Sequence, residues 1–163
     1  MDNWGRVLVP GEWVLCGLTE GDVMTEEQPP GLVRLDDTDL TLARVEDDVR
    51  GMTVVSSDGE EIGKVHGLYV DAAERRVRLL DVEHGGLLGL GAEHRLIPVD
   101  AVVEVTDERV VIGRTRPEIA SAPGYHPDLK EIEPLDNLDE LYGYYGMTPF
   151  WTPGYRYPRF PYR

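Results

Sequence analysis

Two histidines at the ends of a glycine-rich loop are the side chains best placed for metal chemistry in this 163-residue chain. His84 and His94 could converge on one ion, and Glu83 or Glu93 could complete the site, because zinc takes imidazole nitrogen and carboxylate oxygen as ligands. The alternative is that both histidines lie exposed on the loop or form local hydrogen bonds. Since no pair of cysteines accompanies them, we expect no metal and no other cofactor, with His84 and His94 as the candidate ligands if a metal binds.

The loop between these histidines, residues 85–91, resembles a phosphate-binding loop only in its glycine content. A phosphate-binding loop ends in Lys followed by Ser or Thr and opens a helix, whose first N–H groups hold the phosphate. Here that ending is absent, and the next apolar run, residues 96–99, is typical of a strand. We therefore expect a connection between strands and no nucleotide site.

Side chains that could act as nucleophiles or as acid/base groups occur without the partners that catalysis requires. The pattern Gly-x-Ser-x-Gly is absent, and Cys16 has no histidine in its own element to activate its thiolate. Adjacent acids such as Glu60 and Glu61 would point to opposite faces of a strand, which is not the geometry that acid/base catalysis requires. We predict that the protein is not an enzyme.

The segment that must position these residues runs from residue 49 to 113 and consists mainly of short apolar runs. Two β-branched segments flank Asp58-Gly59, a dipeptide typical of a tight hairpin because both central turn positions favour positive φ. Further apolar runs follow at residues 77–82, 96–99 with 102–103, and 110–112. About five or six strands at short spacing, with no helical period between them, predict an all-β fold, a small and highly bent barrel.

Apolar residues fall on both faces of the strand predicted at residues 76–82. One face fills the barrel, so the other must be covered by the flanking segments or by a second copy of the chain, and we predict a homodimer. Gly63 and Gly67 interrupt the preceding strand. We expect a β-bulge or a sharp bend there, because a small barrel must coil its strands tightly.

The order and spacing of these short motifs resemble the PRC-barrel domain family. The motifs are Val49-Arg50-Gly51, Asp58-Gly59-Glu60, Ile62-Gly63-Lys64-Val65, Leu68-Tyr69-Val70-Asp71, Arg76-Val77-Arg78 and Leu96-Ile97-Pro98-Val99. The family includes the cytoplasmic domain of the photosynthetic reaction-centre H subunit, the C-terminal domain of a ribosome-maturation factor and many stand-alone bacterial and archaeal proteins. Because the family shares no set of catalytic residues, the resemblance implies a non-catalytic docking domain.

The charge of the chain restricts its partners. Acids outnumber Lys and Arg by 31 to 16, for a net charge of −15, so direct binding to nucleic acid is disfavoured and a basic protein is the partner that the charge favours. Simple solubility is the alternative explanation of the charge. Cys16 is the only cysteine and no signal peptide is visible, so we expect a cytoplasmic protein.

The first apolar stretch, residues 7–18, contains Pro10, Gly11 and Glu12 and is too short and interrupted to span a bilayer. We therefore expect no transmembrane segment. The reaction-centre H subunit is anchored by an N-terminal transmembrane helix, so this difference argues against a photosynthetic role.

We divide the chain into four parts. Residues 1–48 form an acidic arm, with 12 acids against three arginines and with short strands expected at 6–9 or 13–18 and around Val33 and Leu35. Residues 49–113 form the barrel. Residues 114–141 form a proline-containing connector with short helices expected at 128–132 and 137–142, and residues 142–163 form a tail.

The tail holds six of the eight tyrosines, both phenylalanines, four prolines and three arginines, and no acid. Proline rules out a continuous helix or a central strand and favours an extended conformation that presents rigid aromatic surface. We expect the tail to dock on its own barrel or on a sister subunit; docking on another protein, or on single-stranded nucleic acid, is the alternative. The candidate docking residues are Tyr142, Tyr144, Tyr145, Phe150, Trp151, Tyr155, Arg156, Tyr157 and Arg159.

Together these features predict a non-enzymatic cytoplasmic scaffold or protein-docking module that self-associates. The first alternative is an accessory protein of RNA processing or ribosome assembly that binds a basic ribosomal protein. The second is a sensor of a small molecule or metal, since the mouth of a barrel can hold a ligand.

Overall fold

The computed structural model describes residues 31–37, 41–42, 44, 47–71, 73–85, 91–125 and 138–161. The strands expected at residues 6–9 or 13–18 and the helix expected at 128–132 lie outside these ranges, as do Cys16 and most of the glycine-rich loop.

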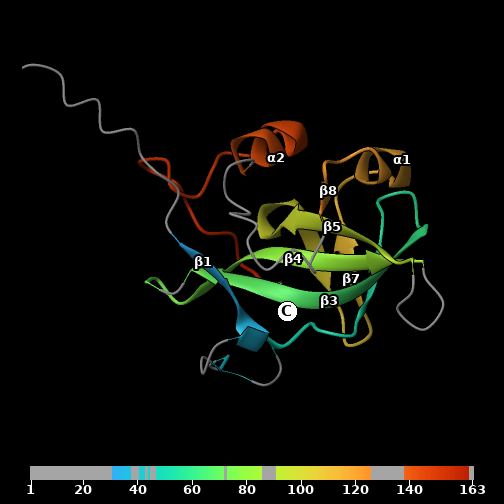
Figure 1. Ribbon diagram of the computed structural model, residues 1–163, viewed down its shortest axis with the longest axis horizontal. Helices are drawn as coiled ribbons and strands as arrows, with labels where there is room; N and C mark the ends of the chain where they lie inside the picture. Colours follow the sequence, from blue (N-terminus) through green and yellow to red (C-terminus); the bar gives the residue numbers. More distant parts are fainter. Residues whose placement is uncertain are drawn as a thin grey trace, which may run out of the picture.

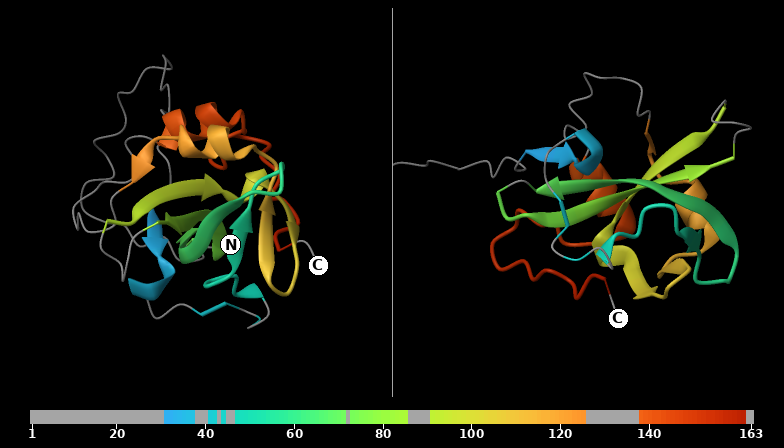
Figure 2. Two further views of the ribbon diagram at one scale, coloured as in Figure 1. Left: turned by 90° about the vertical axis from the view of Figure 1, so that its right-hand side faces the viewer. Right: turned by 90° about the horizontal axis from the view of Figure 1, so that it is seen from below.

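The described strands form one antiparallel-dominated sheet that bends strongly without closing (Figures 1 and 2). The path runs β6-β7-β2-β3-β4-β5-β8, with β1 paired to β3 beside it, and only β2 and β7 are parallel. The strands are β1 (Leu32–Arg34), β2 (Thr53–Val55), β3 (Glu61–Asp71), β4 (Arg76–His84), β5 (Glu93–Pro98), β6 (Val102–Val105), β7 (Arg109–Ile112) and β8 (Gly124–Tyr125). The predicted all-β, bent-barrel class is confirmed.

Two short 3-10 helices, η2 (Leu35–Asp37) and η4 (Val99–Ala101), and two α-helices complete the described elements. The α-helices are α1 (Arg116–Ala120) and α2 (Leu138–Tyr145), which lie with β8 on one side of the sheet (Figure 2). The helix expected at 137–142 is confirmed, and it continues to Tyr145. No helix in the described part of the chain has the length and apolar character needed to cross a bilayer.

The Asp58-Gly59 turn joins β2 to β3 as predicted, but the predicted turn geometry is wrong. Gly59 has a φ of +83°, whereas Asp58 is not among the described residues with positive φ. The loop is also longer than a two-residue turn: the N–H of Gly59 donates to the Ser56 carbonyl, and the Ser56 hydroxyl accepts from the N–H of Glu60 at 3.1 Å. Positive φ is therefore needed at one position only, and glycine occupies it.

Three bulges bend the central strands, and the predicted irregularities at Gly63 and Gly67 are confirmed. Between β2 and β3 the register skips Ile62, and between β3 and β4 it skips His66 on one strand and Arg78 on the other. A Cβ atom at Gly63 would overlap the carbonyl oxygen of Glu83, so only glycine fits this close approach of β3 to β4. A bulge also redirects the extra side chain, which matters for each site below.

Every residue of β4 from Val77 to Val82 is buried within this one chain. Arg78 meets aromatic rings of the C-terminal tail, while Asp81 faces Arg34 of β1. The uncovered apolar face that motivated the homodimer prediction is therefore covered by the chain's own segments.

Candidate functional site

In three places of the described structure, polar side chains gather around the extra residue of a bulge. We call them the tail clasp, around Arg78; the Asp81 network, around Asp81; and the α1 pocket, between α1 and the ends of β3, β4 and β5. Each contains the extra residue of one bulge: Arg78, His66 and Ile62 respectively.

Arg78 is the centre of the tail clasp and is almost completely buried, with 1% of its surface exposed. Three rings of the tail surround its guanidinium carbon, with ring centroids 4.6 Å away for Phe150, 5.5 Å for Tyr155 and 5.4 Å for Tyr157. A guanidinium on aromatic faces is attracted by their π electrons, and more strongly where water is excluded. The clasp thus joins the barrel to residues more than 70 positions later in the sequence.

The guanidinium of Arg78 also meets two carboxylates, one at the end of β3 and one in the turn that follows. Its Nη2 lies 3.5 Å from Oδ2 of Asp71, which is also buried, and forms an ion pair with Glu74. Asp71 Oδ1 accepts the N–H groups of Ala73 and Glu74 at 2.9 and 3.2 Å. Asp71, fixed by these backbone bonds, and Glu74 compensate the buried charge of Arg78, as a buried ion requires.

Two tyrosine hydroxyls complete the clasp. Tyr155 donates to Oδ1 of Asp100 at 2.7 Å, and Tyr157 donates to the carbonyl of Val77 at 3.1 Å. Burial raises the pKa of the Asp100 carboxyl above its ordinary value, and the bond from Tyr155 partly offsets this. The guanidinium carbon of Arg76 lies 4.5 Å from the centroid of the Tyr157 ring. The tail is therefore held by polar contacts as well as by packing.

The nine docking candidates fall into three groups. Tyr142, Tyr145 and Phe150 are buried in the core of their own chain, and Trp151, Tyr155 and Tyr157 pack against it partly exposed. Tyr144, Arg156 and Arg159 are exposed. The described tail therefore lies on its own barrel, and of the last three only Tyr144 has a described partner, since its hydroxyl donates to the carbonyl of Glu118 at 2.5 Å.

A matched pair of tyrosine substitutions separates packing from hydrogen bonding in this region. The Tyr142 hydroxyl is buried with no hydrogen-bond partner in the described residues, so Tyr142→Phe should leave the free energy of unfolding unchanged or raise it by up to about 1 kcal/mol. Tyr155→Phe loses a bond to a carboxylate and should lower it by about 1.5–3 kcal/mol. Urea denaturation measures both changes. Equal losses would contradict the assignment of a stabilising hydrogen bond to the Tyr155 hydroxyl and of none to the Tyr142 hydroxyl.

The Asp81 network lies beside the bulge of β3 at His66. Asp81 is completely buried, and its Oδ1 lies 2.8 Å from Nδ1 of His94, while Oδ2 lies 3.7 Å from Nη2 of Arg34. Burial raises the pKa of the Asp81 carboxyl, and the bond to His94 acts in the opposite direction. These contacts tie β1, β4 and β5 together.

His66, the extra residue of this bulge, extends the network to solvent. Its Nδ1 lies 3.0 Å from Glu83, and its ring stands nearly perpendicular to that of His94 with centroids 5.1 Å apart. Next to His94, the hydroxyls of Tyr69 and Tyr125 are hydrogen-bonded to each other. Within the described residues, Oδ2 of Asp81 and Nε of Arg34 are buried without a hydrogen-bond partner, so the network is only partly satisfied.

His84 and His94 are not brought together, because they face opposite sides of the regular β4–β5 ladder. His84 pairs in register with Glu93, and Glu83 with His94, and successive residues of a strand alternate faces. His84 instead donates to the carbonyl of Ile62 through Nδ1. No group of three His, Cys, Asp or Glu side chains with metal-binding geometry lies within the described ranges.

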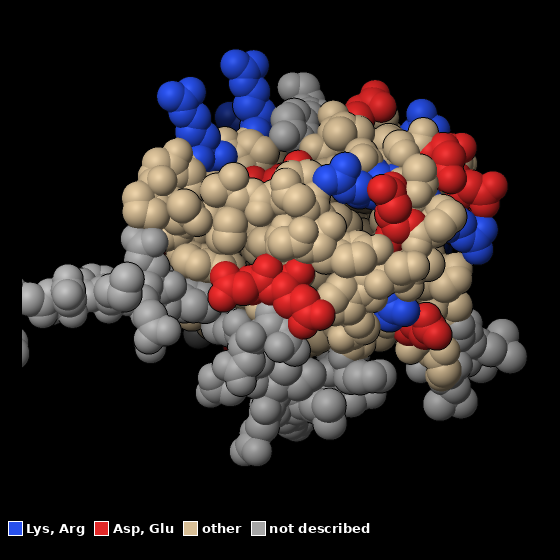
Figure 3. Space-filling view, turned by 90° about the horizontal axis from the view of Figure 1, so that it is seen from above, with Lys and Arg blue, Asp and Glu red and all other residues tan. Residues whose placement is uncertain are grey.

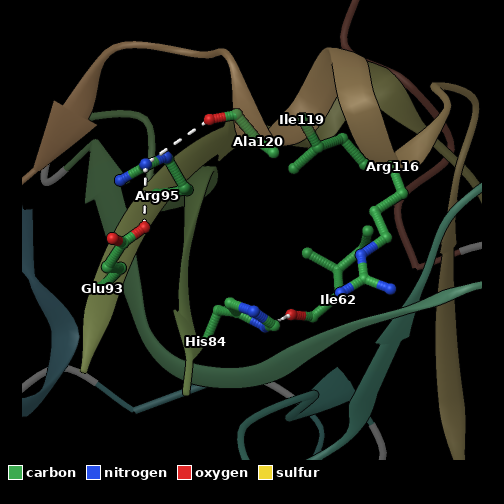
Figure 4. A pocket seen from close by; sticks show the side chains of 7 residues that line it. All are labelled: Ile62, His84, Glu93, Arg95, Arg116, Ile119 and Ala120. Atoms are coloured by element: carbon green, nitrogen blue, oxygen red, sulfur yellow. Dashed lines mark hydrogen bonds and ion pairs between the residues drawn. The ribbon is translucent and has the colours of Figure 1, made fainter. Parts of the chain in front are cut away.

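The α1 pocket is a hollow of about 50 Å³ that is partly open to solvent. Ile62, Ile119 and Ala120 supply its apolar lining, and charged side chains stand around it (Figure 4). A capping box stabilises the start of α1, which borders the pocket: Glu118 accepts the N–H of Thr115 at 2.7 Å. The polar lining residues are His84, Glu93, Arg95 and Arg116.

Sequence reasoning missed Arg78, Asp81 and both arginines of the α1 pocket. A signal was present for the first two: a charged residue inside an otherwise apolar strand must find a partner when the strand is buried. For Arg95 and Arg116 no signal was present, because they are surface-type residues about 20 positions apart.

These features define a class: a small, bent all-β domain extended by a short helix and an aromatic tail that packs back on it. Within it, residues 47–116 match the family model of the PRC-barrel domain, and this part of the chain is a PRC-barrel domain. The match spans β2 to β7 and ends where α1 begins; β1, β8, α2 and the tail lie outside it. The resemblance inferred from the short motifs is confirmed.

Proposed function

We propose that the protein is a non-enzymatic cytoplasmic docking module that recognises a basic protein partner by charge. The observation that carries the proposal is the character of the exposed surface. Among the described residues only two large apolar side chains are exposed, Val103 at 56% and Tyr144 at 42%. Because so few large apolar side chains are exposed there, we expect recognition through that surface to depend on polar and charged groups.

The net charge supports a basic partner. The whole chain carries −15, although on the face that bears α1 and α2 both acidic and basic side chains stand on a largely uncharged surface (Figure 3). An excess of acid steers a basic partner during association and repels nucleic acid. The match to the PRC-barrel domain identifies the domain and names no partner.

Self-association remains part of the proposal, but the apolar face of β4 no longer supports it. Both faces of β4 are covered inside one chain, so a dimer would have to form through other surfaces. The solution mass measured by light scattering decides the matter: twice the chain mass of 18.3 kDa supports the dimer, and a single chain mass rejects it.

Affinity capture with the full chain tests the docking role. We expect nuclease treatment of the extract to leave the captured proteins unchanged, and we expect them to be basic and to dissociate when salt is raised from about 0.05 M to about 0.5 M, where charges are strongly screened. Capture that disappears after nuclease treatment would contradict the proposal and favour the RNA-linked alternative. A ribosomal protein among the salt-sensitive, nuclease-resistant partners would combine docking with ribosome assembly.

A further inference from the structure

We propose that the α1 pocket is a binding site for a small organic anion, a carboxylate on a short apolar body. This goes beyond the docking role and concerns a different part of the surface. The pocket combines an apolar lining with two arginines from different elements, on a strongly acidic chain.

The positive charge is contributed by two elements that converge on the hollow. Arg95 comes from β5 and Arg116 from α1, and His84 at the end of β4 stands between them (Figure 4). Glu93 is the only carboxylate among the lining residues, and Glu60, outside the lining, pairs with Arg116, so each arginine faces one glutamate. An arginine guanidinium matches the two oxygens of a carboxylate, which makes an anion the ligand that this lining favours.

Arg95 is already held in place for such a ligand. Its Nη1 donates to the carbonyl of His94 at 3.0 Å, and its Nη2 lies 3.5 Å from the carbonyl of Ala120 on α1. Its Nε is buried and has no hydrogen-bond partner in the described residues. Because the main chain fixes the guanidinium, less side-chain freedom is lost when an anion binds.

The glutamates that pair with these arginines are easily displaced. Arg116 lies 2.8 Å from Glu60, and Arg95 lies 3.1 Å from Glu93, and the two glutamate side chains are 55% and 67% exposed. Exposed ion pairs contribute little to stability, so a ligand carboxylate can replace either glutamate while the glutamate turns into water.

The apolar lining selects against a bare inorganic anion. Ile62 and Ile119 are 6% and 1% exposed, and together with Ala120, which is exposed, they form the part of the lining that has no polar group. A short hydrocarbon body on this surface removes apolar area from water, which adds binding energy that phosphate or acetate cannot provide. A hollow of about 50 Å³ that is partly open to solvent limits the ligand to a small molecule.

Titration of the ¹⁵N-labelled full chain with hexanoate at neutral pH and constant ionic strength tests the proposal. We expect saturable shifts of the amides of Arg95 and Ala120, weaker binding of hexanol, which lacks the charge, and weaker binding of inorganic phosphate, which lacks the apolar body. Arg116→Gln should raise the dissociation constant at least about tenfold, the loss expected for one charge-assisted contact.

Arg109→Gln is the matched control, because it removes the same charge from an exposed residue of β7 outside the pocket, and it should bind hexanoate like the wild type. Ala120→Phe fills the hollow from an exposed position and should abolish the shifts while the remaining spectrum shows a folded chain. Phosphate or hexanol binding as tightly as hexanoate would overturn the assigned ligand class. Equal affinity of the Arg116→Gln and Arg109→Gln variants, or shifts that never saturate, would overturn the site.

Discussion

Replacing Arg78 by alanine is expected to lower the free energy of unfolding by about 3–5 kcal/mol, the range measured when one partner of a buried ion pair is removed. The substitution leaves the buried Asp71 carboxylate without its cation and removes the side chain that fills the space between Phe150, Tyr155 and Tyr157. Stability is measured by urea denaturation. We also expect faster trypsin cleavage after Arg156 and Arg159, because the clasp holds the segment that contains them.

Arg76 provides a control on the same strand. Its guanidinium also lies over an aromatic ring, that of Tyr157, but the residue is exposed, so Arg76→Ala should cost about 1 kcal/mol or less. Similar losses for the two variants would show that the buried charge of Arg78 contributes no more than a surface contact and would remove the basis of the tail clasp.

Ending the chain at Leu141 should abolish cooperative folding. The deletion removes four buried aromatic residues, Tyr142, Tyr145, Phe150 and Phe160. At about 1.5–3 kcal/mol for each buried large side chain, the loss is comparable to the whole stability of a typical domain, about 5–15 kcal/mol. We expect the shortened chain to show poor dispersion in its amide spectrum and to aggregate in light scattering, since barrel surface normally covered by the tail becomes exposed.

A chain that ends at Pro161 is the control, because it keeps all four of these aromatic residues, and it should unfold like the full chain. A chain ending at Leu141 that stays monomeric and unfolds cooperatively, within about 1 kcal/mol of the full chain, would show that the barrel folds alone. The tail would then be a separable element, and the exposed Tyr144, Arg156 and Arg159 would become the first residues to test for partner binding.

Much of the barrel could be predicted because its signals are local. The Asp58-Gly59 hairpin and the short apolar runs depend on neighbouring residues, and the order of these motifs was enough to indicate the PRC-barrel family. The bulges at Gly63 and Gly67 were also visible, because a glycine inside a strand commonly marks a bend or a close approach of the backbone.

The residues that come together at the three polar clusters could not be predicted in the same way. In a regular strand the face of a side chain follows from its position, but each bulge adds a residue and changes the alternation beyond it. Ile62, His66 and Arg78 are such residues, and each takes part in one cluster. Along β4 and β5 the ladder is regular, and this regularity directs His84 and His94 to opposite faces.

By itself the sequence determined the strand content, the main hairpin, the acidic charge and the family, since these properties depend on local composition and motif order. Only the tertiary structure decided that the aromatic tail covers its own barrel, that Arg78 is the buried cation it surrounds, and that Arg95 and Arg116 flank one hollow. The physical reason is that these contacts join residues distant in sequence. Their formation depends on the register of the sheet and on the path of the connecting chain, which no local pattern specifies.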